Sequence, residues 1–296
     1  MEKPLPSLVG FSEKNHQWFA EGISLAKLAH DFSTPLYVYS KEAICSAYRA
    51  YDAACIRPNG TRRARIHYAM KANSNLAVLD ELKQLGAGFD LVSGGELARA
   101  LQIGADPKSL VFAGVGKSSA EIENALRAGV KCINVESISE LQRVNAIAKT
   151  LGLRAPISLR VNPDVDANTH PYISTGLKDN KFGIAFHDVL KTYREAARLP
   201  HIDVLGIDCH IGSQITSASP YLDALDKVLG LITQLQLEGI TIHHLDLGGG
   251  LGIDYGGESP PNITEFTNTL LNRIEEQGFN HLEVLLEPGR SLVGNA

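Results

Sequence analysis

The stretch HYAMKANSN, residues 67–75, places one lysine, Lys71, at the end of a run of apolar and small residues. A lysine in such a position is either a surface residue or a nucleophile held where water is scarce. In an apolar pocket a lysine can lose its proton and form a Schiff base with an aldehyde. Lys71 is therefore a candidate for covalent chemistry, and a salt-bridged structural lysine is the alternative.

Polar and glycine residues end or follow five later apolar runs. They are Asp90, Arg160, Asn162, His210, Ser213, Asp246, Gly248, Gly249, Gly250, Glu287, Gly289 and Arg290. Each alone has a structural explanation: His210 could be a satisfied core histidine, the glycine triplet a tight turn, and Glu287 the ion-pair partner of Arg290. A set drawn from six runs is hard to explain as packing alone, so the interpretation rests on the combination.

The combination predicts a site for pyridoxal phosphate. A glycine triplet before a helix supplies backbone N–H donors that a phosphate can approach closely. The pyridine nitrogen of that cofactor needs an acidic partner to stay protonated, and Glu287 is placed for this role. His210 is the candidate for contact with the face of the flat ring.

The elements that must position these residues alternate in type. Eight short β-branched runs are predicted as strands, at 65–71, 88–93, 109–114, 132–137, 157–163, 204–212, 243–250 and 283–289. Helical patterns lie between them, at 75–86, 95–104, 119–129, 138–152, 187–199, 221–239 and 263–278. A further helix, at 41–55, precedes the first strand.

Strict alternation of strands and helices predicts parallel pairing. An open, doubly wound sheet is one solution, but eight units over roughly 250 residues is the size of a (β/α)8 barrel. We therefore predict an α/β fold, a TIM barrel over residues 36–296, with the site at the C-terminal ends of its strands. No helix is predicted after the last strand, and the helix at 41–55 could fill that gap. Residues 1–35 fit no barrel unit and form a separate lead-in.

Composition excludes several other classes of protein. The net charge is −5 with no block of Lys or Arg, so a nucleic-acid or membrane-surface partner has no support. No 18-residue apolar span and no signal peptide are found, which predicts a cytoplasmic location. The four cysteines show no CxxC spacing, so we expect free thiols and no zinc or other metal.

Two short motifs resemble nucleotide-binding loops without matching them. AGVGKSSAE, at 113–121, contains GKS, but a P-loop needs glycine where Val111 stands, so Lys117 is interpreted as a loop residue. LGGGLG, at 247–252, lacks the rest of a dinucleotide-binding unit.

The motifs YAMKAN, GFDLVSGGEL, RVNPDVDANTHPYISTGLKDNKFGI, CHIGSQ, LDLGGGLGIDY and LLEPGRSLVGNA match one family in type, order and spacing. The sequence resembles the diaminopimelate decarboxylases, in the alanine-racemase-like class of pyridoxal-phosphate enzymes, from about residue 30 to its end. YAxKAN and EPGR alone indicate only a basic amino acid decarboxylase. The long THPYISTGLKDNKFGI segment favours the diaminopimelate branch over the ornithine and arginine decarboxylases.

The resemblance implies roles for individual residues. Lys71 would form the Schiff base, His210 would stack on the cofactor ring, and Glu287 would pair with the pyridine nitrogen. Asp90 matches an aspartate near the lysine. The phosphate would be bound by Ser213, Gly248, Gly249, Gly250, Gly289 and Arg290. Arg290 would also lie near a substrate carboxylate.

The implied reaction removes one carboxylate from meso-diaminopimelate to give L-lysine and carbon dioxide. Family members continue into a β-rich C-terminal domain. The Cys-Glu-Ser/Thr motif of that domain reaches the partner's site in a homodimer. The same domain would pack on the lead-in. The sequence ends at Ala296 without that domain. We therefore expect a truncated diaminopimelate decarboxylase. The alternatives are a stand-alone barrel that binds the cofactor without turnover and another basic amino acid decarboxylase.

Overall fold

Eight parallel strands form a closed ring in the computed structural model, which describes residues 9–165 and 182–296. The ring consists of β4 (Ala64–Ala69), β5 (Gly88–Leu91), β6 (Leu110–Phe112), β7 (Cys132–Val135), β8 (Ala155–Asn162), β10 (Ile202–Asp208), β11 (His244–Asp246) and β12 (Glu283–Leu286). Consecutive strands pair in parallel, and β12 pairs with β4 while β8 pairs with β10, which closes the barrel. The two-residue strand β9 (Ile184–Ala185) pairs in parallel with the C-terminal end of β8. The predicted TIM barrel is confirmed.

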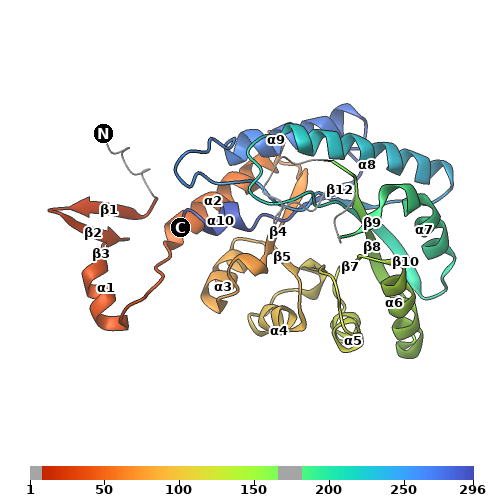
Figure 1. Ribbon diagram of the computed structural model, residues 1–296, viewed down its shortest axis with the longest axis horizontal. Coiled ribbons are helices and arrows are strands. Elements are labelled where there is room, and N and C mark those ends of the chain that lie inside the picture. The colour runs from red at the N-terminus through yellow and green to blue at the C-terminus, as the bar shows by residue number, and fades with distance from the viewer. Residues whose placement is uncertain (1–8, 166–181) are drawn as a thin grey trace.

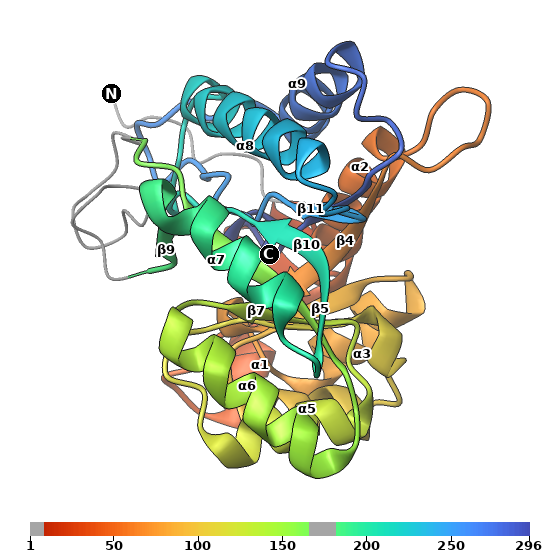
Figure 2. The same cartoon turned by 90° about the vertical axis from the view of Figure 1, so that its right-hand side faces the viewer.

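Helices cover the outside of the barrel (Figures 1 and 2). They are α3 (Leu76–Gln84), α4 (Gly94–Gln102), α5 (Ser119–Ala128), α6 (Ile138–Leu151), α7 (Phe186–Arg198), α8 (Ser219–Leu237) and α9 (Ile263–Glu276). Seven serine or asparagine residues of the described chain cap α-helix N-termini by accepting a backbone N–H bond, at Ser24, Ser40, Asn75, Ser93, Ser118, Ser137 and Asn262.

The helix before the first strand, α2 (Lys41–Ala54), packs beside α9 and closes the helical layer next to the last strand, as predicted. The prediction that no helix follows β12 is wrong, because the one-turn helix α10 (Arg290–Val293) lies there. The hydroxyl groups of Tyr51 and Ser291, 2.8 Å apart, join α2 to α10. Among the described helices none is both long and apolar enough to cross a membrane.

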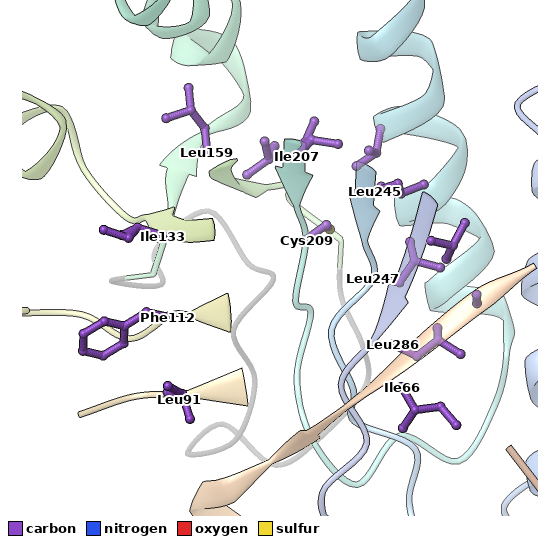
Figure 3. Packing of buried hydrophobic residues seen from close by; sticks show 14 of the residues in the cluster. Ile66, Leu91, Phe112, Ile133, Leu159, Ile207, Cys209, Leu245, Leu247 and Leu286 are labelled. Carbon is purple, nitrogen blue, oxygen red and sulfur yellow. The ribbon is translucent and has the colours of Figure 1, made fainter. Parts of the chain in front are cut away.

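Apolar side chains fill the layer between strands and helices. One buried residue of this layer from each barrel strand is drawn in Figure 3: Ile66, Leu91, Phe112, Ile133, Leu159, Ile207, Leu245 and Leu286. They are directed toward the surrounding helices. Because side chains alternate along a strand, their neighbours in sequence face the barrel axis.

The interior of the barrel is unusually polar and holds two buried histidines. His67 and His244 are each 2% exposed. A Cβ atom at Gly88 would lie 2.6 Å from the His67 ring, and one at Gly206 would lie 2.1 Å from the His244 ring. Each histidine therefore occupies space that a glycine on the neighbouring strand leaves free.

The lead-in forms a small unit beside the barrel, on the left in Figure 1. Strands β1 (Phe11–Lys14), β2 (Gln17–Ala20) and β3 (Ile23–Ser24) make an antiparallel sheet, and α1 (Leu25–Phe32) follows without one buried residue. Glu21 accepts hydrogen bonds from the Ser40 hydroxyl and the Glu42 backbone, both at 2.7 Å, and so ties this unit to the start of α2.

Lys117, interpreted from sequence as a loop residue, does lie in the β6–α5 loop but is buried. Its amine donates to the carbonyls of Gly114 (2.8 Å) and Asn134 (2.7 Å) and to the carboxylate of Glu140 (2.7 Å). All three N–H bonds are thus used, and Lys117 fastens this loop to β7 and α6.

Candidate active site

Most of the residues singled out from sequence line two adjoining cavities at the C-terminal end of the barrel. Seven of them line a cavity of about 650 Å³: Lys71, His210, Ser213, Gly250, Glu287, Gly289 and Arg290. Asp90 lines a second cavity of about 360 Å³, which shares Lys71, His210 and Glu287 with the first. A further space of about 730 Å³ between Tyr37 and α3 contains none of the predicted residues.

Lys71 lies one turn beyond its strand. β4 ends at Ala69, and Met70–Ala72 form a short 3₁₀ helix, so the predicted strand end at Lys71 is wrong by two residues. The side chain is 51% exposed, because it projects into the open cavity, and its amine lies 2.7 Å from the Asp90 carboxylate. Lys71 is therefore accessible, and not held where water is scarce.

The charge on Lys71 also differs from the sequence-based expectation. Burial opposes the ammonium form, but the carboxylates of Asp90 and Glu287 outweigh it and raise the pKa of Lys71 above its ordinary value. Without a bound molecule the amine is protonated and paired, so it must transfer a proton before it can act as a nucleophile. Asp90, the partner of that amine, is 1% exposed and has one carboxylate oxygen unpartnered among the described residues.

Glu287 follows β12 and is 7% exposed. Burial, together with the nearby carboxyls of Asp246 and Asp90, raises the pKa of Glu287 well above its ordinary value. Its Oε1 atom has no hydrogen-bond partner among the described residues. A buried carboxyl group in this state is suited to a ring nitrogen that supplies the missing partner.

The glycine triplet forms a turn with no space for side chains. Gly248 and Gly250 have φ values of 64° and 109°, which favour glycine. A Cβ atom on Gly249 would lie 2.0 Å from the Glu287 carbonyl oxygen, and one on Gly250 would lie 2.3 Å from the Gly212 carbonyl oxygen. The backbone can therefore approach these neighbours closely only because the side chains are absent.

The amides of the triplet point to different partners. The Gly248 N–H donates to Asp246 at 3.0 Å, and the Gly249 N–H donates to Nδ1 of His210 at 3.3 Å. Neither Gly248 nor Gly249 lines the two cavities. Among the described residues, the amides of Gly250 and Gly289 donate no hydrogen bond, and both glycines line the larger cavity. These two amides are therefore available to a bound anion.

Arg290 and Ser213 stand beside the two available amides. Nη2 and Nε of Arg290 lie 3.3 and 3.4 Å from the Ser213 hydroxyl oxygen. The guanidinium also donates to the Tyr255 hydroxyl and lies 5.7 Å from the centre of that ring. A cation, a hydroxyl group and two amides at one end of the cavity form an anion-binding set.

His210 follows β10 and is held neutral. Burial, together with the positive charges of Arg160 and Lys71, lowers the pKa of His210 well below its ordinary value. Since Nδ1 accepts the Gly249 N–H, the ring proton resides on Nε2. A neutral, fixed imidazole can offer a flat face to a planar ligand.

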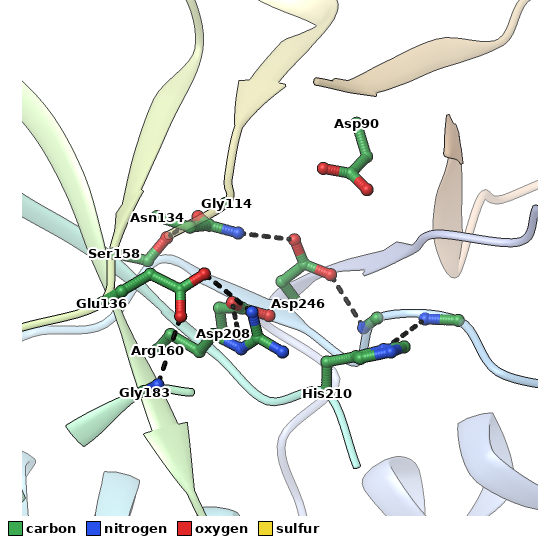
Figure 4. Close-up of polar contacts among 12 residues, drawn as sticks. Asp90, Gly114, Asn134, Glu136, Ser158, Arg160, Gly183, Asp208, His210 and Asp246 are labelled. Carbon is green, nitrogen blue, oxygen red and sulfur yellow. Dashed lines mark hydrogen bonds and ion pairs between the residues drawn. The ribbon is translucent and has the colours of Figure 1, made fainter. Parts of the chain in front are cut away.

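A buried charge network, of which Arg160 and Asp208 line the smaller cavity, was not assigned a role from sequence. Arg160 donates to Glu136 at 2.7 Å and lies 3.9 Å from Asp208, and Glu136 also accepts the Gly183 N–H at 3.2 Å (Figure 4). Carboxylate oxygens of Asp208, Asp246 and Glu287 lie within 4.8 Å of one another. Arg160, Asn162 and Asp246 stand out in the sequence as strand-end polar residues. The side-chain partners of Arg160 and Asp246 come from other strands, whereas Asn162 accepts the N–H of Asp164, two residues along the chain, at 3.0 Å. The motif residues 166–181 lie outside the described residues.

The comparisons with known proteins agree with this arrangement. Residues 42–294 match the family model of the pyridoxal-binding domain of pyridoxal-dependent decarboxylases. The chain is 53% identical over 284 residues to diaminopimelate decarboxylase of Vibrio cholerae, covering 96% of this chain and 67% of the relative. It is 52% identical to the Pseudomonas aeruginosa enzyme of that name, covering 97% and 67%.

Two solved structures extend the likeness to three dimensions. The diaminopimelate decarboxylase of Helicobacter pylori, complexed with L-lysine, matches with a TM-score of 0.85 at 40% identity, covering 90% of this chain and 66% of that one. That of M. jannaschi matches with a TM-score of 0.89 at 39% identity, covering 96% and 67%. The chain thus spans about two thirds of the length of these relatives.

Proposed function

Because the chain belongs to the pyridoxal-dependent decarboxylases, we propose that it is the cofactor-binding barrel of a diaminopimelate decarboxylase, which converts meso-diaminopimelate to L-lysine and carbon dioxide. One observation carries the proposal. One cavity is lined by a reactive amine, a buried acid with an unpartnered oxygen and an anion-binding set. These groups match the aldehyde, the ring nitrogen and the phosphate of a single molecule.

The residues present fit pyridoxal phosphate. Gly250, Gly289, Ser213 and Arg290 would hold the phosphate, while Gly248 and Gly249 would support the turn from behind. Glu287 would pair with the ring nitrogen, which supplies the partner that its buried oxygen lacks. His210 would offer the neutral face of its ring.

The chemistry then divides between the cofactor and the chain. When bound, the cofactor accepts the electron pair left on Cα as the carboxylate leaves. Lys71 provides the nucleophilic amine, and Asp90, which accepts its hydrogen bond at 2.7 Å, orients it. Arg290 provides a cation for a substrate carboxylate beside the phosphate. Glu287 stabilises positive charge on the ring nitrogen.

The test combines trapping with a substrate panel. The chain is mixed with pyridoxal phosphate, reduced with borohydride and digested, and the peptides are identified by mass spectrometry. The added mass is expected on the peptide with Lys71 and on no other peptide. Carbon dioxide release is then measured with meso-diaminopimelate, ornithine and arginine, and release from diaminopimelate alone is expected. Label on another lysine, or release from ornithine or arginine at a comparable rate, would reject the assignment.

The assembly and the domain boundary belong to the same proposal. We propose a homodimer in the cytoplasm, with the lead-in over residues 1–35 contacting a second domain of the full-length enzyme. The exposed apolar side chains of the lead-in support this contact, since Phe32 is 69% and Ile23 48% exposed. Sedimentation equilibrium of the chain and of a full-length relative would measure the two masses.

A further inference from the structure

A chain of four polar side chains crosses the barrel interior beneath the cavity. It runs from His244 through Ser158 and Asn134 to Asp246, and its last three members are labelled in Figure 4. Asn134, Ser158 and Asp246 are 0% exposed. Barrel interiors are usually filled by branched apolar residues, so a continuous polar path at this depth calls for an explanation.

The donors and acceptors of this path follow from its last member. The Asp246 carboxylate only accepts, so the amide nitrogen of Asn134, 3.5 Å away, is the donor. The Asn134 oxygen therefore faces Ser158, whose hydroxyl donates to it at 2.7 Å. Ser158 has no second proton, so the Nε2–H of His244 donates to it at 3.2 Å. Burial lowers the pKa of His244 to about 4, which agrees with a neutral ring carrying that single proton.

Asp246 uses its other oxygen to hold the glycine turn. Oδ1 accepts the Gly248 N–H at 3.0 Å. The Gly248 carbonyl in turn accepts the Glu287 N–H at 2.7 Å, and the next amide, that of Gly249, donates to His210. The backbone oxygen of Asp246 also accepts the N–H of Cys209, the residue before His210, at 3.0 Å. Asp246 is therefore hydrogen-bonded to backbone groups next to Glu287 and His210, the two residues predicted to contact the cofactor ring.

We propose that Asp246 is a positioning residue, oriented by the His244–Ser158–Asn134 chain so that its carboxylate fixes the Gly248–Gly249 turn against Glu287 and His210. This inference rests on the proposed function, since the turn matters only if the cavity receives the cofactor. Asp246 does not line either cavity and is not a catalytic residue.

The proposal can be tested by exchanging the amide donor of Asn134 and the carboxylate acceptor of Asp246 between the two positions. Asp246 accepts hydrogen bonds from the N–H of Gly248 and the amide of Asn134, and its carboxyl group also contacts that of Glu287. The D246N side chain has one acceptor and one donor, so one of those two donors loses its acceptor. N134D places a second carboxylate against Asp246. The double variant N134D/D246N restores both bonds, because the new amide donates to the new carboxylate and still accepts from Gly248.

Two readouts apply to the full chain. The first is the dissociation constant of pyridoxal phosphate, from a titration of visible absorbance. The second is hydrogen exchange of the peptide covering 246–250 in the protein without cofactor. Losing one charge-assisted hydrogen bond is expected to weaken binding and speed exchange by about tenfold or more in each single variant, and the double variant should return to within about threefold of wild type. D106N, which alters an exposed carboxylate that accepts a backbone N–H at 2.9 Å, is the matched control and should change neither readout.

Each result has a defined meaning. A double variant no better than the singles would overturn the inference, because it would show that the charge at position 246, not the hydrogen-bond geometry, is required. The inference would also be overturned if D246N matched wild type in both readouts. The same holds if the double variant recovered the wild-type exchange rate but not the wild-type cofactor affinity. If wild type fails to bind the cofactor, the proposed function fails, and the exchange readout alone decides whether Asp246 fixes the turn.

Discussion

The two faces of the barrel strands are built from different chemistry. The outward face is apolar, as Phe112, Ile133 and Leu159 show, and packs against the helices (Figure 3). The inward face carries buried polar groups such as Asn134 and Asp246 (Figure 4). Because adjacent residues of one strand serve opposite faces, stability and ligand chemistry are encoded by alternate positions. Changes to the outward face should therefore leave cofactor affinity largely intact.

Shortening an outward side chain should give the largest loss of stability. Phe112 is fully buried between β6 and the helices. F112A is expected to lower the free energy of unfolding by about 3–5 kcal/mol, through lost burial and a residual cavity. Urea denaturation measures the change. Cofactor affinity should stay within a few-fold of wild type in conditions where the variant is folded, and a large loss of affinity there would break the separation of faces.

The inward histidines should make stability fall in acid. Burial lowers the pKa of His67 to about 3 and that of His244 to about 4, both below 6.5. Between pH 6.5 and 4.5 the unfolded chain gains protons at these positions and the folded chain does not, so each histidine should cost about 2–3 kcal/mol over that interval.

The raised pKa of Asp246, about 6, acts in the opposite direction, because the folded chain then binds the extra proton as the pH falls. The histidine effect is therefore isolated by comparing wild type with H67L. Urea denaturation at pH 6.5 and 4.5 should show a smaller loss in the variant. Equal losses would mean that His67 takes up a proton in the folded protein.

Adding one methyl group to the inward face should destabilise the barrel moderately. In G206A the new Cβ atom would lie 2.1 Å from the His244 ring. Overpacking of this kind typically costs about 1–3 kcal/mol. Thermal unfolding would measure it, and G206A/H244A should recover part of the loss because the clashing ring is removed. A double variant less stable than the sum of the singles would contradict the assigned contact.

The smallest effect is expected at a helix end away from both faces. Ser118 and Glu121 form a capping box at the start of α5. S118A should lower stability by about 1 kcal/mol and leave cofactor affinity unchanged. Urea denaturation beside a cofactor titration checks both, and S118T, which keeps the hydroxyl group, is the matched control. A change in affinity would show that α5 transmits strain to the cavity.

The sequence was sufficient for the order and closure of the barrel, because alternating apolar runs and helical patterns are local signals. Strand ends were less predictable: Lys71 lies in a 3₁₀ turn, and α10 is too short to leave a pattern. The apolar run before Lys71 suggested a dry site, yet the tertiary fold leaves that side chain half exposed and paired with Asp90.

The site residues were found as a set, but their arrangement was not. A glycine triplet predicts a tight turn, whereas only the fold shows that Gly248 and Gly249 face Asp246 and His210 and that Gly250 faces the cavity. The contact between Asn134 and Asp246 joins residues 112 positions apart in the chain. No local pattern in a single sequence contains such a pairing.

The most direct test of the account is one pair of measurements on wild type and K71A. Wild type mixed with pyridoxal phosphate is expected to develop the visible absorbance of lysine-bound cofactor, and K71A is not. The unfolding free energies of the two proteins without cofactor should differ by only about 1 kcal/mol, because the Lys71 side chain is half exposed. The same absorbance in both proteins, or in neither, would contradict the claim that the inward face of this barrel is built around a reactive Lys71.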